Sequence, residues 1–188
     1  MTERTPSGLI KTTSRAKTYQ DTDLDQTPDR ITETVTTNGK ATTLVTDTLQ
    51  AKRSVTSAEG RSVTASYDPN TLLTTNLSIP GLFETTYGYD LRGRLTSITT
   101  DLRQTKFTYD AQGNLESITD SENQTTTYFY DAVGRMTGIS RPDATSIGFI
   151  YDKNGNMAVL TNPATIHHSF VYNKVNLNSS YDTPLSGS

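Results

Sequence analysis

Aromatic, β-branched and polar positions follow one another along this chain in a block that returns about every 21 residues. The segment beginning at Tyr109 reads YDAQGNLESI: a Tyr-Asp pair, two variable residues, Gly, Asn and an aliphatic residue. Close copies begin at Tyr89 (YDLRGRLTSI), Tyr130 (YDAVGRMTGI) and Tyr151 (YDKNGNMAVL). Counted between Asp residues, the spacing is 22 from Asp68 to Asp90, and then 20, 21 and 21 up to Asp152. This regular period indicates a repeat protein.

Within one block the pattern predicts two strands and two turns. Residues 94–100 are rich in β-branched side chains, residues 101–104 are polar as in a turn, and residues 105–109 alternate with Phe107 and Tyr109 on one face. Two strands of about 5–7 residues and two turns of about four fill the period, and no helical period is found. Each block is therefore predicted to be a β-hairpin.

The number of hairpins follows from extending this period in both directions. Backward steps from Asp68 reach Asp47 and Asp25, and the forward step from Asp152 reaches Tyr172-Asn173. About seven units are expected, most regular from Tyr89 to Leu160.

The Asp-x-x-Gly turn has a physical reason for its residue types. An Asp side chain accepts hydrogen bonds from backbone N–H groups two residues on, and Gly in the fourth place adopts the positive φ that closes a type I turn with a bulge. The second turn of each hairpin, as in SAEGR from Ser57 or SENQT from Ser121, is expected to be looser. Asn38-Gly39 is the strongest isolated hairpin signal.

The aliphatic residues after the turn do not fit simple alternation. Leu95 and Ile98 are three residues apart, so a regular strand would place them on opposite faces. Either a bulge after the Gly changes the phase, or each strand has an apolar contact on both faces. We favour the bulge, because a glycine of positive φ commonly accompanies one.

Composition narrows the class of protein. The 188-residue chain is only 32% hydrophobic, yet it has ten Tyr and five Phe and is rich in Thr, Val and Ile, residues that suit a pleated, half-buried surface. Without Cys it has neither disulfides nor a Cys-based metal site, and a net charge of −3 argues against a nucleic-acid surface. The sequence contains no apolar run long enough for a membrane span and no recognisable signal peptide, so any export signal is expected outside this chain.

Hairpins repeated at a fixed period can pair edge to edge. The fold class we expect is all-β, a continuous coiling antiparallel sheet that forms a β-spiral or a partial shell. The repeat tyrosines would then form a ladder across the strands. The structural repeat residues are Tyr67, Asp68, Tyr89, Asp90, Gly93, Tyr109, Asp110, Gly113, Tyr130, Asp131, Gly134, Tyr151, Asp152, Gly155 and Tyr172.

The Tyr-Asp-x-x-Gly-Arg-Leu pattern at this period resembles the YD repeat of the RHS (rearrangement hot spot) family. That family includes bacterial polymorphic toxins, the C components of insecticidal toxin complexes and the animal teneurins. The resemblance implies a β-sheet strip that spirals into a large hollow shell, which in the toxins encloses a cleaved C-terminal effector. In teneurins a similar shell serves cell-surface recognition.

Two features depart from this family. A closed shell needs many more than seven units, and the segment rich in Pro, Asp and Gly that ends bacterial shells, with their self-cleaving aspartates, is not recognisable here. We therefore expect either a fragment of a longer protein or a short array that binds other copies. The expected divisions are residues 1–24 (irregular or a degenerate repeat), 25–88 (degenerate YD-like hairpins), 89–182 (well-formed YD repeats) and 183–188 (a tail).

Candidate catalytic and metal-binding residues are few. His167 and His168 are the only histidines, and neighbours in a strand face opposite ways, so surface or edge positions are the expected interpretation. The run from Asp21 to Asp25 resembles the start of a calcium loop, but an EF-hand would have Gly and Glu where Gln26 and Thr32 stand. The tyrosine ladder could also bind glycans by stacking, although packing is the favoured interpretation.

These observations predict a non-enzymatic structural segment, without cofactor or metal, of a secreted or cell-surface RHS-repeat protein. It would build part of a β-shell that encloses or presents a passenger polypeptide, such as a C-terminal toxin. The alternative is an extracellular binding or self-assembly module that contacts glycans, proteins or other copies of itself by β-augmentation. The expected partners are further repeats of the same or a longer chain, and neither a nucleic acid nor a membrane.

Overall fold

A computed structural model describes residues 2–4 and 10–182, which form β-strands joined by turns. In the first of two compact units, Met1–Leu102, the described residues form nine strands. They are β1 (Thr2–Arg4), β2 (Ile10–Gln20), β3 (Arg30–Thr37), β4 (Lys40–Asp47), β5 (Lys52–Thr56), β6 (Ser62–Tyr67), β7 (Thr74–Ser78), β8 (Thr85–Tyr89) and β9 (Leu95–Thr100).

In the second unit, Arg103–Ser188, eight strands are described, up to residue 182. They are β10 (Arg103–Tyr109), β11 (Leu115–Thr119), β12 (Thr125–Tyr130), β13 (Met136–Ser140), β14 (Ser146–Tyr151), β15 (Met157–Thr161), β16 (His167–Tyr172) and β17 (Asn178–Asp182). In the part that the structure describes, neither unit contains a helix.

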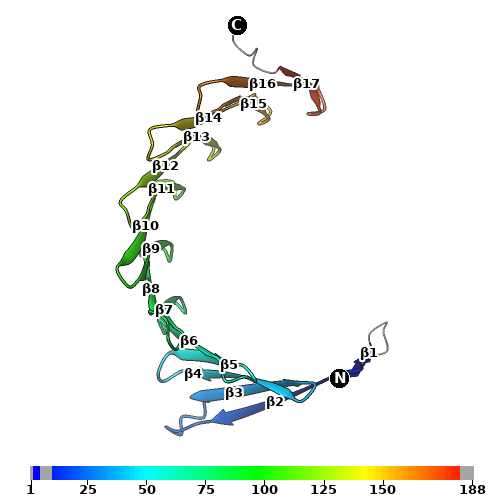
Figure 1. Ribbon diagram of the computed structural model, residues 1–188, viewed down its shortest axis with the longest axis vertical. Coiled ribbons are helices and arrows are strands. Elements are labelled where there is room, and N and C mark those ends of the chain that lie inside the picture. The colour runs from blue at the N-terminus through cyan, green and yellow to red at the C-terminus, as the bar shows by residue number, and fades with distance from the viewer. Residues whose placement is uncertain (1, 5–9, 183–188) are drawn as a thin grey trace. The chain divides into compact units, whose positions relative to one another are not determined.

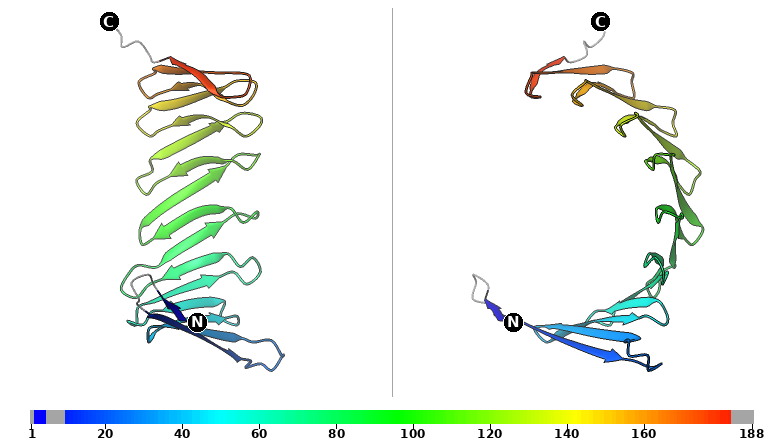
Figure 2. Two further views of the ribbon diagram at one scale, coloured as in Figure 1. Left: turned by 90° about the vertical axis from the view of Figure 1, so that its right-hand side faces the viewer. Right: turned by 180° about the vertical axis from the view of Figure 1, so that it is seen from behind.

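Within each unit, every strand pairs antiparallel with the strand that follows it in the chain. Figure 1 shows these consecutive hairpins, and Figure 2 shows that their turns alternate between the two ends of the strands. The all-β fold of repeated antiparallel hairpins, predicted from the 21-residue period, is confirmed.

The expected bulge after each Asp-x-x-Gly turn is also present. Tyr89 pairs with Leu95 but Gly88 pairs with Ser97, so Thr96 is an additional residue on β9. The same shift occurs at Tyr67, Tyr109, Tyr130, Tyr151 and Tyr172. Because Tyr87 pairs with Ile98, the bulge brings Leu95 and Ile98 onto the face that carries the tyrosines.

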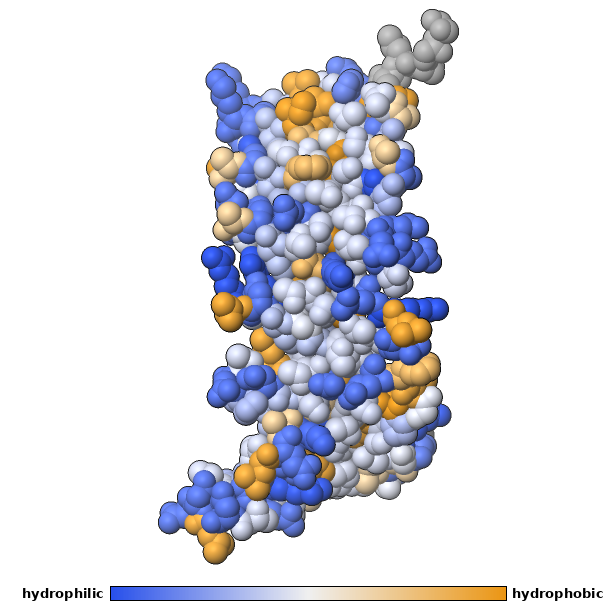
Figure 3. All heavy atoms as spheres, turned by 90° about the vertical axis from the view of Figure 1, so that its left-hand side faces the viewer, coloured by the Kyte–Doolittle hydropathy of each residue, from blue (hydrophilic) through white to orange (hydrophobic). Residues whose placement is uncertain are grey.

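Register gives the second unit two different faces. We call the apolar one the tyrosine face; it carries Phe107, Tyr109, Leu115, Ile118, Tyr128, Tyr130, Met136, Ile139, Ile147, Phe149, Tyr151, Met157, Leu160, Phe170 and Tyr172. The other, the hydroxyl face, carries Thr108, Ser117, Thr119, Thr125, Thr127, Ser140, Ser146, Thr161 and Ser169, together with Phe129, Ile150 and Val171. Figure 3 shows a side of the molecule whose middle is pale, with apolar residues as separate orange patches.

In neither unit do the described residues form a second layer over the sheet. Among the described residues only Tyr67 and Asp29 are buried, at 7% and 5% exposure. The residues of the tyrosine face are half-buried, since they pack sideways against one another and not beneath another element.

The N-terminal segment predicted as residues 1–24 contains a long strand. Within the segment expected to be irregular or a degenerate repeat, residues 10–20 form β2, which pairs with β3 over its last eight residues. The predicted tail, 183–188, lies outside the described residues.

Candidate functional site in the Tyr-Asp turns

The four Tyr-Asp turns that begin at Asp90, Asp110, Asp131 and Asp152 are closed by the same two backbone hydrogen bonds. In the β8–β9 turn the N–H of Asp90 donates to the carbonyl of Arg94 and the N–H of Gly93 donates to the carbonyl of Asp90, both at 2.9 Å. Gly93 has a φ of 78°, a region in which a side chain causes strain. The turns that begin at Asp110, Asp131 and Asp152 repeat this arrangement.

The Asp side chain completes the turn, and the residue after Gly assists it. Oδ1 of Asp131 accepts hydrogen bonds from the backbone N–H groups of Val133 (3.0 Å) and Arg135 (2.9 Å), while its Oδ2 accepts Nε of Arg135 at 2.7 Å. Asn114 makes the equivalent side-chain bond to Asp110 through Nδ2 at 2.9 Å. Arg and Asn therefore recur after the Gly because both can donate to the second carboxylate oxygen.

This pairing of Asp with Arg or Asn was not predicted from the sequence, although the recurrence of these two residue types was visible there. The pairing lowers the pKa of the Asp carboxylates. The backbone N–H of Arg135, followed by its side chain, holds the pKa of Asp131 below its usual value, and desolvation opposes this. For Asp110 the side chain of Asn114 has the largest effect in lowering the pKa.

The repeat tyrosines join one hairpin to the preceding one. The hydroxyl of Tyr151 donates to the carbonyl of Met136 at 2.8 Å, and that of Tyr89 donates to the carbonyl of Thr74 at 2.9 Å. The guanidinium of Arg135 lies 4.6 Å from the ring centroid of Tyr151. In these repeats the tyrosine thus contacts the backbone, and at Tyr151 also an arginine, of the preceding hairpin.

The turns at the other end of the strands were expected to be looser, but those between β5 and β6, β11 and β12, β13 and β14, and β15 and β16 have the same five-residue geometry. In the β15–β16 turn, the N–H of Asn162 donates to the carbonyl of Ile166 (3.0 Å), and that of Thr165 donates to the carbonyl of Asn162 (2.9 Å). The fourth residue again has a positive φ, 62° at Thr165 and 63° at Ala144. The turns with Thr165 and Ala144 lack the Gly signal because non-glycine residues occupy the left-handed position, whereas Gly60 occupies it in the β5–β6 turn.

Two of the predicted repeat positions differ from the others. The turn after Tyr67 is one residue longer, since the N–H of Asp68 donates to the carbonyl of Leu73 at 2.9 Å. After Tyr172 the Asp is replaced by Asn173, whose Oδ1 accepts the backbone N–H groups of Val175 and Leu177, both at 3.0 Å.

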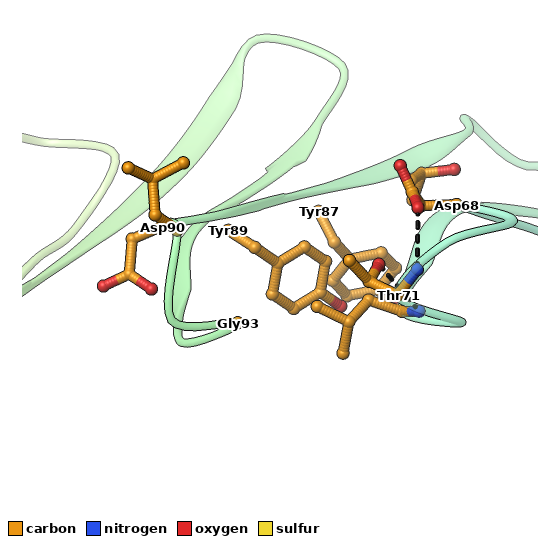
Figure 4. A pocket seen from close by; sticks show the side chains of 9 residues that line it. Asp68, Thr71, Tyr87, Tyr89, Asp90 and Gly93 are labelled. Carbon is orange, nitrogen blue, oxygen red and sulfur yellow. Dashed lines mark hydrogen bonds between the residues drawn. The ribbon is translucent and has the colours of Figure 1, made fainter.

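A pocket of about 370 Å³ lies between the long Asp68 turn and the β8–β9 turn. Figure 4 shows Tyr87 and Tyr89 side by side between these two turns, with Asp68 and Thr71 on one side and Gly93 on the other. The pocket therefore combines aromatic rings with a carboxylate.

The two histidines do not converge on a common site. His167 lies on the hydroxyl face, where Nδ1 is 2.9 Å from the hydroxyl of Thr161. His168 lies on the opposite face, with Nδ1 2.6 Å from the hydroxyl of Tyr181. Their partners are single hydroxyl groups, and such a pair lacks the further ligands that a metal or acid–base site requires.

The acidic loop before β3 brings together Asp21, Asp23 and Asp29, whose carboxylate oxygens lie within 4.8 Å of one another. Sequence reasoning named Asp21 and Asp23 but not Asp29, which is buried and bonded to the backbone and hydroxyl of Thr22. Asp25, the third aspartate of the expected run, instead bonds Thr27. These three carboxylates could hold a hard cation only if it replaced the existing hydrogen bonds of Asp29.

Similar folds occur in solved structures of toxin complexes. "Crystal Structure of TcdB2-TccC3-TEV" matches with a TM-score of 0.57 and 14% identity over 89% of this chain and 11% of that chain. "Crystal Structure of TcdB2-TccC3-Cdc42" matches with a TM-score of 0.55 and 16% identity over 96% of this chain and 12% of that chain. "Structure of Photorhabdus luminescens Tc holotoxin pore, Mutation TccC3-D651A" matches with a TM-score of 0.54 and 15% identity over 96% of this chain and 12% of that chain. At these identities the likeness concerns the fold, and the chain spans about an eighth of those proteins.

Comparison of the sequence with protein families and with curated proteins gives a match to a family model. No curated protein matches the chain. The model of the family described as Teneurin YD-shell matches residues 10–186, which include all the Tyr-Asp turns and both units from β2 onward. The chain belongs to the YD-shell family, as the resemblance to RHS/YD-repeat proteins implied.

Proposed function

We propose that this chain is a non-enzymatic segment of the wall of a secreted or cell-surface YD shell, and that the shell encloses or presents a passenger polypeptide. A structural shell segment is what the family and the toxin-complex folds support directly. The passenger is the further step of the proposal.

The observation that carries this proposal is the incomplete burial of the tyrosine face. This face presents a continuous set of aromatic and aliphatic side chains, yet none of them is fully buried by the described residues. An apolar sheet face of this size is normally covered, because each square ångström of apolar surface removed from water contributes about 25 cal/mol. A polypeptide held against the wall would provide that cover.

The proposal that the segment is not an enzyme rests on its side chains. The Asp residues of the turns accept backbone N–H groups, and in the four turns from Asp90 to Asp152 they also bond an Arg or Asn side chain, so they serve as turn acceptors. His167 and His168 face opposite sides of the sheet. We infer that the chemistry of such a protein belongs to the passenger.

The proposed location is secreted or at the cell surface, in agreement with the family and the similar toxin structures. Among the described residues, no helix is long and apolar enough to cross a membrane.

The experiment is native mass spectrometry of the protein isolated from its source, followed by protease treatment before and after denaturation. We expect a covalent chain well above 20.6 kDa, or a second polypeptide that resists protease until the assembly is denatured. A chain of 20.6 kDa without a protected second polypeptide would contradict the passenger.

A second candidate, self-assembly, is favoured by a row of exposed apolar residues on the hydroxyl face. Phe129, Ile150 and Val171 occupy the same position in successive repeats and are 51%, 58% and 50% exposed. Such a row would be covered where two copies pack together. In the same experiment, assemblies at integral multiples of 20.6 kDa would support this candidate.

A further inference from the structure

In the second unit, an arginine side chain lies between two successive Tyr-Asp turns. Nε of Arg135 donates to Asp131 of its own turn at 2.7 Å, and the guanidinium lies 4.6 Å from the ring centroid of Tyr151 in the next repeat. Nη1 lies 3.6 Å from where a Cβ on Gly155 would stand. A guanidinium is thus bounded by a carboxylate, an aromatic ring and a glycine.

The first unit has the same arrangement without the guanidinium. Leu73 occupies the place of Arg135, because its carbonyl accepts the N–H of Asp68 at 2.9 Å as that of Arg135 accepts the N–H of Asp131. Its Cδ1 lies 3.4 Å from where a Cβ on Gly93 would stand. Leu73 therefore occupies the glycine end of the space but brings neither a charge nor a donor.

The pocket of about 370 Å³ is found at this place. Its walls include the rings of Tyr87 and Tyr89 and the carboxylate of Asp68 (Figure 4). Oδ1 of Asp68 accepts the backbone N–H groups of Asn70 (2.8 Å) and Thr71 (2.9 Å). In the four repeats that follow, an Arg or Asn side chain from the turn also bonds the Asp, and Leu73 cannot do this.

The charges around the pocket favour a cation. Asp90, the other carboxylate in its lining, is paired with Arg94 at 2.7 Å. Asp68 has no such ion pair among the described residues. The pKa of Asp68 is lowered, chiefly by the backbone N–H of Thr71 and then by that of Asn70, which keeps the carboxylate charged at neutral pH.

We propose that this pocket binds the guanidinium of an arginine side chain that belongs to another polypeptide segment. The guanidinium would lie over the ring of Tyr89 and donate to Asp68, in the manner of Arg135 with Tyr151 and Asp131. Arg53 over the ring of Tyr67, at 4.8 Å, is a second example of this contact within the molecule. The inference concerns one pocket and holds whether or not the shell encloses a passenger.

The test is a titration of the 188-residue protein with N-acetyl-L-arginine N-methylamide, followed by the amide signals in NMR spectra. We expect saturable shifts at Thr71 and Tyr89. The corresponding norleucine and lysine compounds serve as probes of the apolar stem and of a point charge. If the norleucine or lysine compound produces the same shifts at the same concentrations, the guanidinium site is refuted.

Two variants test whether the arginine compound binds in this pocket, and a third serves as the control. Asp68→Asn should weaken binding about tenfold, because a charged acceptor is lost. Leu73→Arg should abolish it by supplying the guanidinium from within, and should do so even if Asp68→Asn fails to fold. Asp143→Asn, a carboxylate in a turn of the second unit, should leave the affinity unchanged. Unchanged binding by Leu73→Arg, or equal loss in Asp143→Asn, would overturn the proposal.

Discussion

The fourth residue of the five-residue turns lies in the left-handed region of the backbone, whether or not it is glycine. Gly134 has a φ of 82°, and Ala144 and Thr165 have φ values of 63° and 62°. Around Gly134 the nearest atom to an added Cβ is Oδ1 of Asn114 at 3.8 Å, an ordinary contact. The need for glycine at this position is therefore conformational and not steric crowding by neighbours.

Replacement of Gly134 by valine should lower the free energy of unfolding by about 1–2 kcal/mol, because a β-branched residue is strained at positive φ. Gly134→Asn should cost clearly less, since Asn tolerates this region. Urea unfolding of both variants checks the prediction. Equal losses in the two variants would indicate that the cost comes from crowding.

A second prediction at this scale concerns the turn carboxylates and pH. The pKa of Asp131 is lowered in the folded state, mainly by the backbone N–H of Arg135 and then by its side chain. A lowered folded pKa means that the charged form stabilises the fold above the unfolded pKa of about 3.9, and that this contribution is lost as the pH falls through the folded value.

Asp131→Asn should therefore lower the melting temperature most at neutral pH, and the difference from the parent protein should shrink below about pH 4. The backbone part of the turn should survive, since Asn173 accepts the equivalent N–H groups in the last hairpin. Thermal unfolding monitored by circular dichroism between neutral and acidic pH measures this. A difference that stays constant with pH would exclude the charge as its cause.

At the scale of the strand, the two faces of β14 provide a matched comparison. Ile147 is half-buried on the tyrosine face, where it pairs with Ile139, whereas Ile150 is 58% exposed on the hydroxyl face. Ile147→Thr should lower the free energy of unfolding by about 1–2 kcal/mol and Ile150→Thr by less than about 0.5 kcal/mol. Chemical denaturation of the two single variants is the measurement. Equal costs would mean that lateral packing does not distinguish the faces.

Much of the element-level structure could be predicted because its signals are local. The spacing of Tyr109 and Asp110 from their counterparts gives the hairpin period, and Leu95 with Ile98 indicates the bulge. The geometry of the second turns was missed, because Ala144 and Thr165 adopt a backbone region that their residue types disfavour. The contact of Arg135 with Tyr151 joins two repeats, and its partner could not be identified without the register.

At the scale of the whole molecule, stability should be local. Within each unit, the strands in contact are those that follow one another in the chain. A protein built this way gains its stability from each hairpin and its interfaces with the neighbouring hairpins, and distant hairpins are coupled only through the intervening ones. A substitution that strains one turn should therefore destabilise the adjacent hairpins, and this destabilisation should become smaller with distance along the chain.

Hydrogen exchange of two matched variants tests this locality. Gly155→Val, in the β14–β15 turn, should reduce the protection of amides in β12 to β17 and leave β3 and β4 unchanged. Gly39 lies in the β3–β4 turn and has a similar φ (79°, against 88° at Gly155). Gly39→Val should reduce the protection of amides in β3 and β4 and leave β12 to β17 unchanged. The two glycines lie in different units, so each variant is the control for the other. If either substitution lowered protection equally in both units, the chain would unfold as one cooperative body, and the nearest-neighbour description of its stability would be wrong.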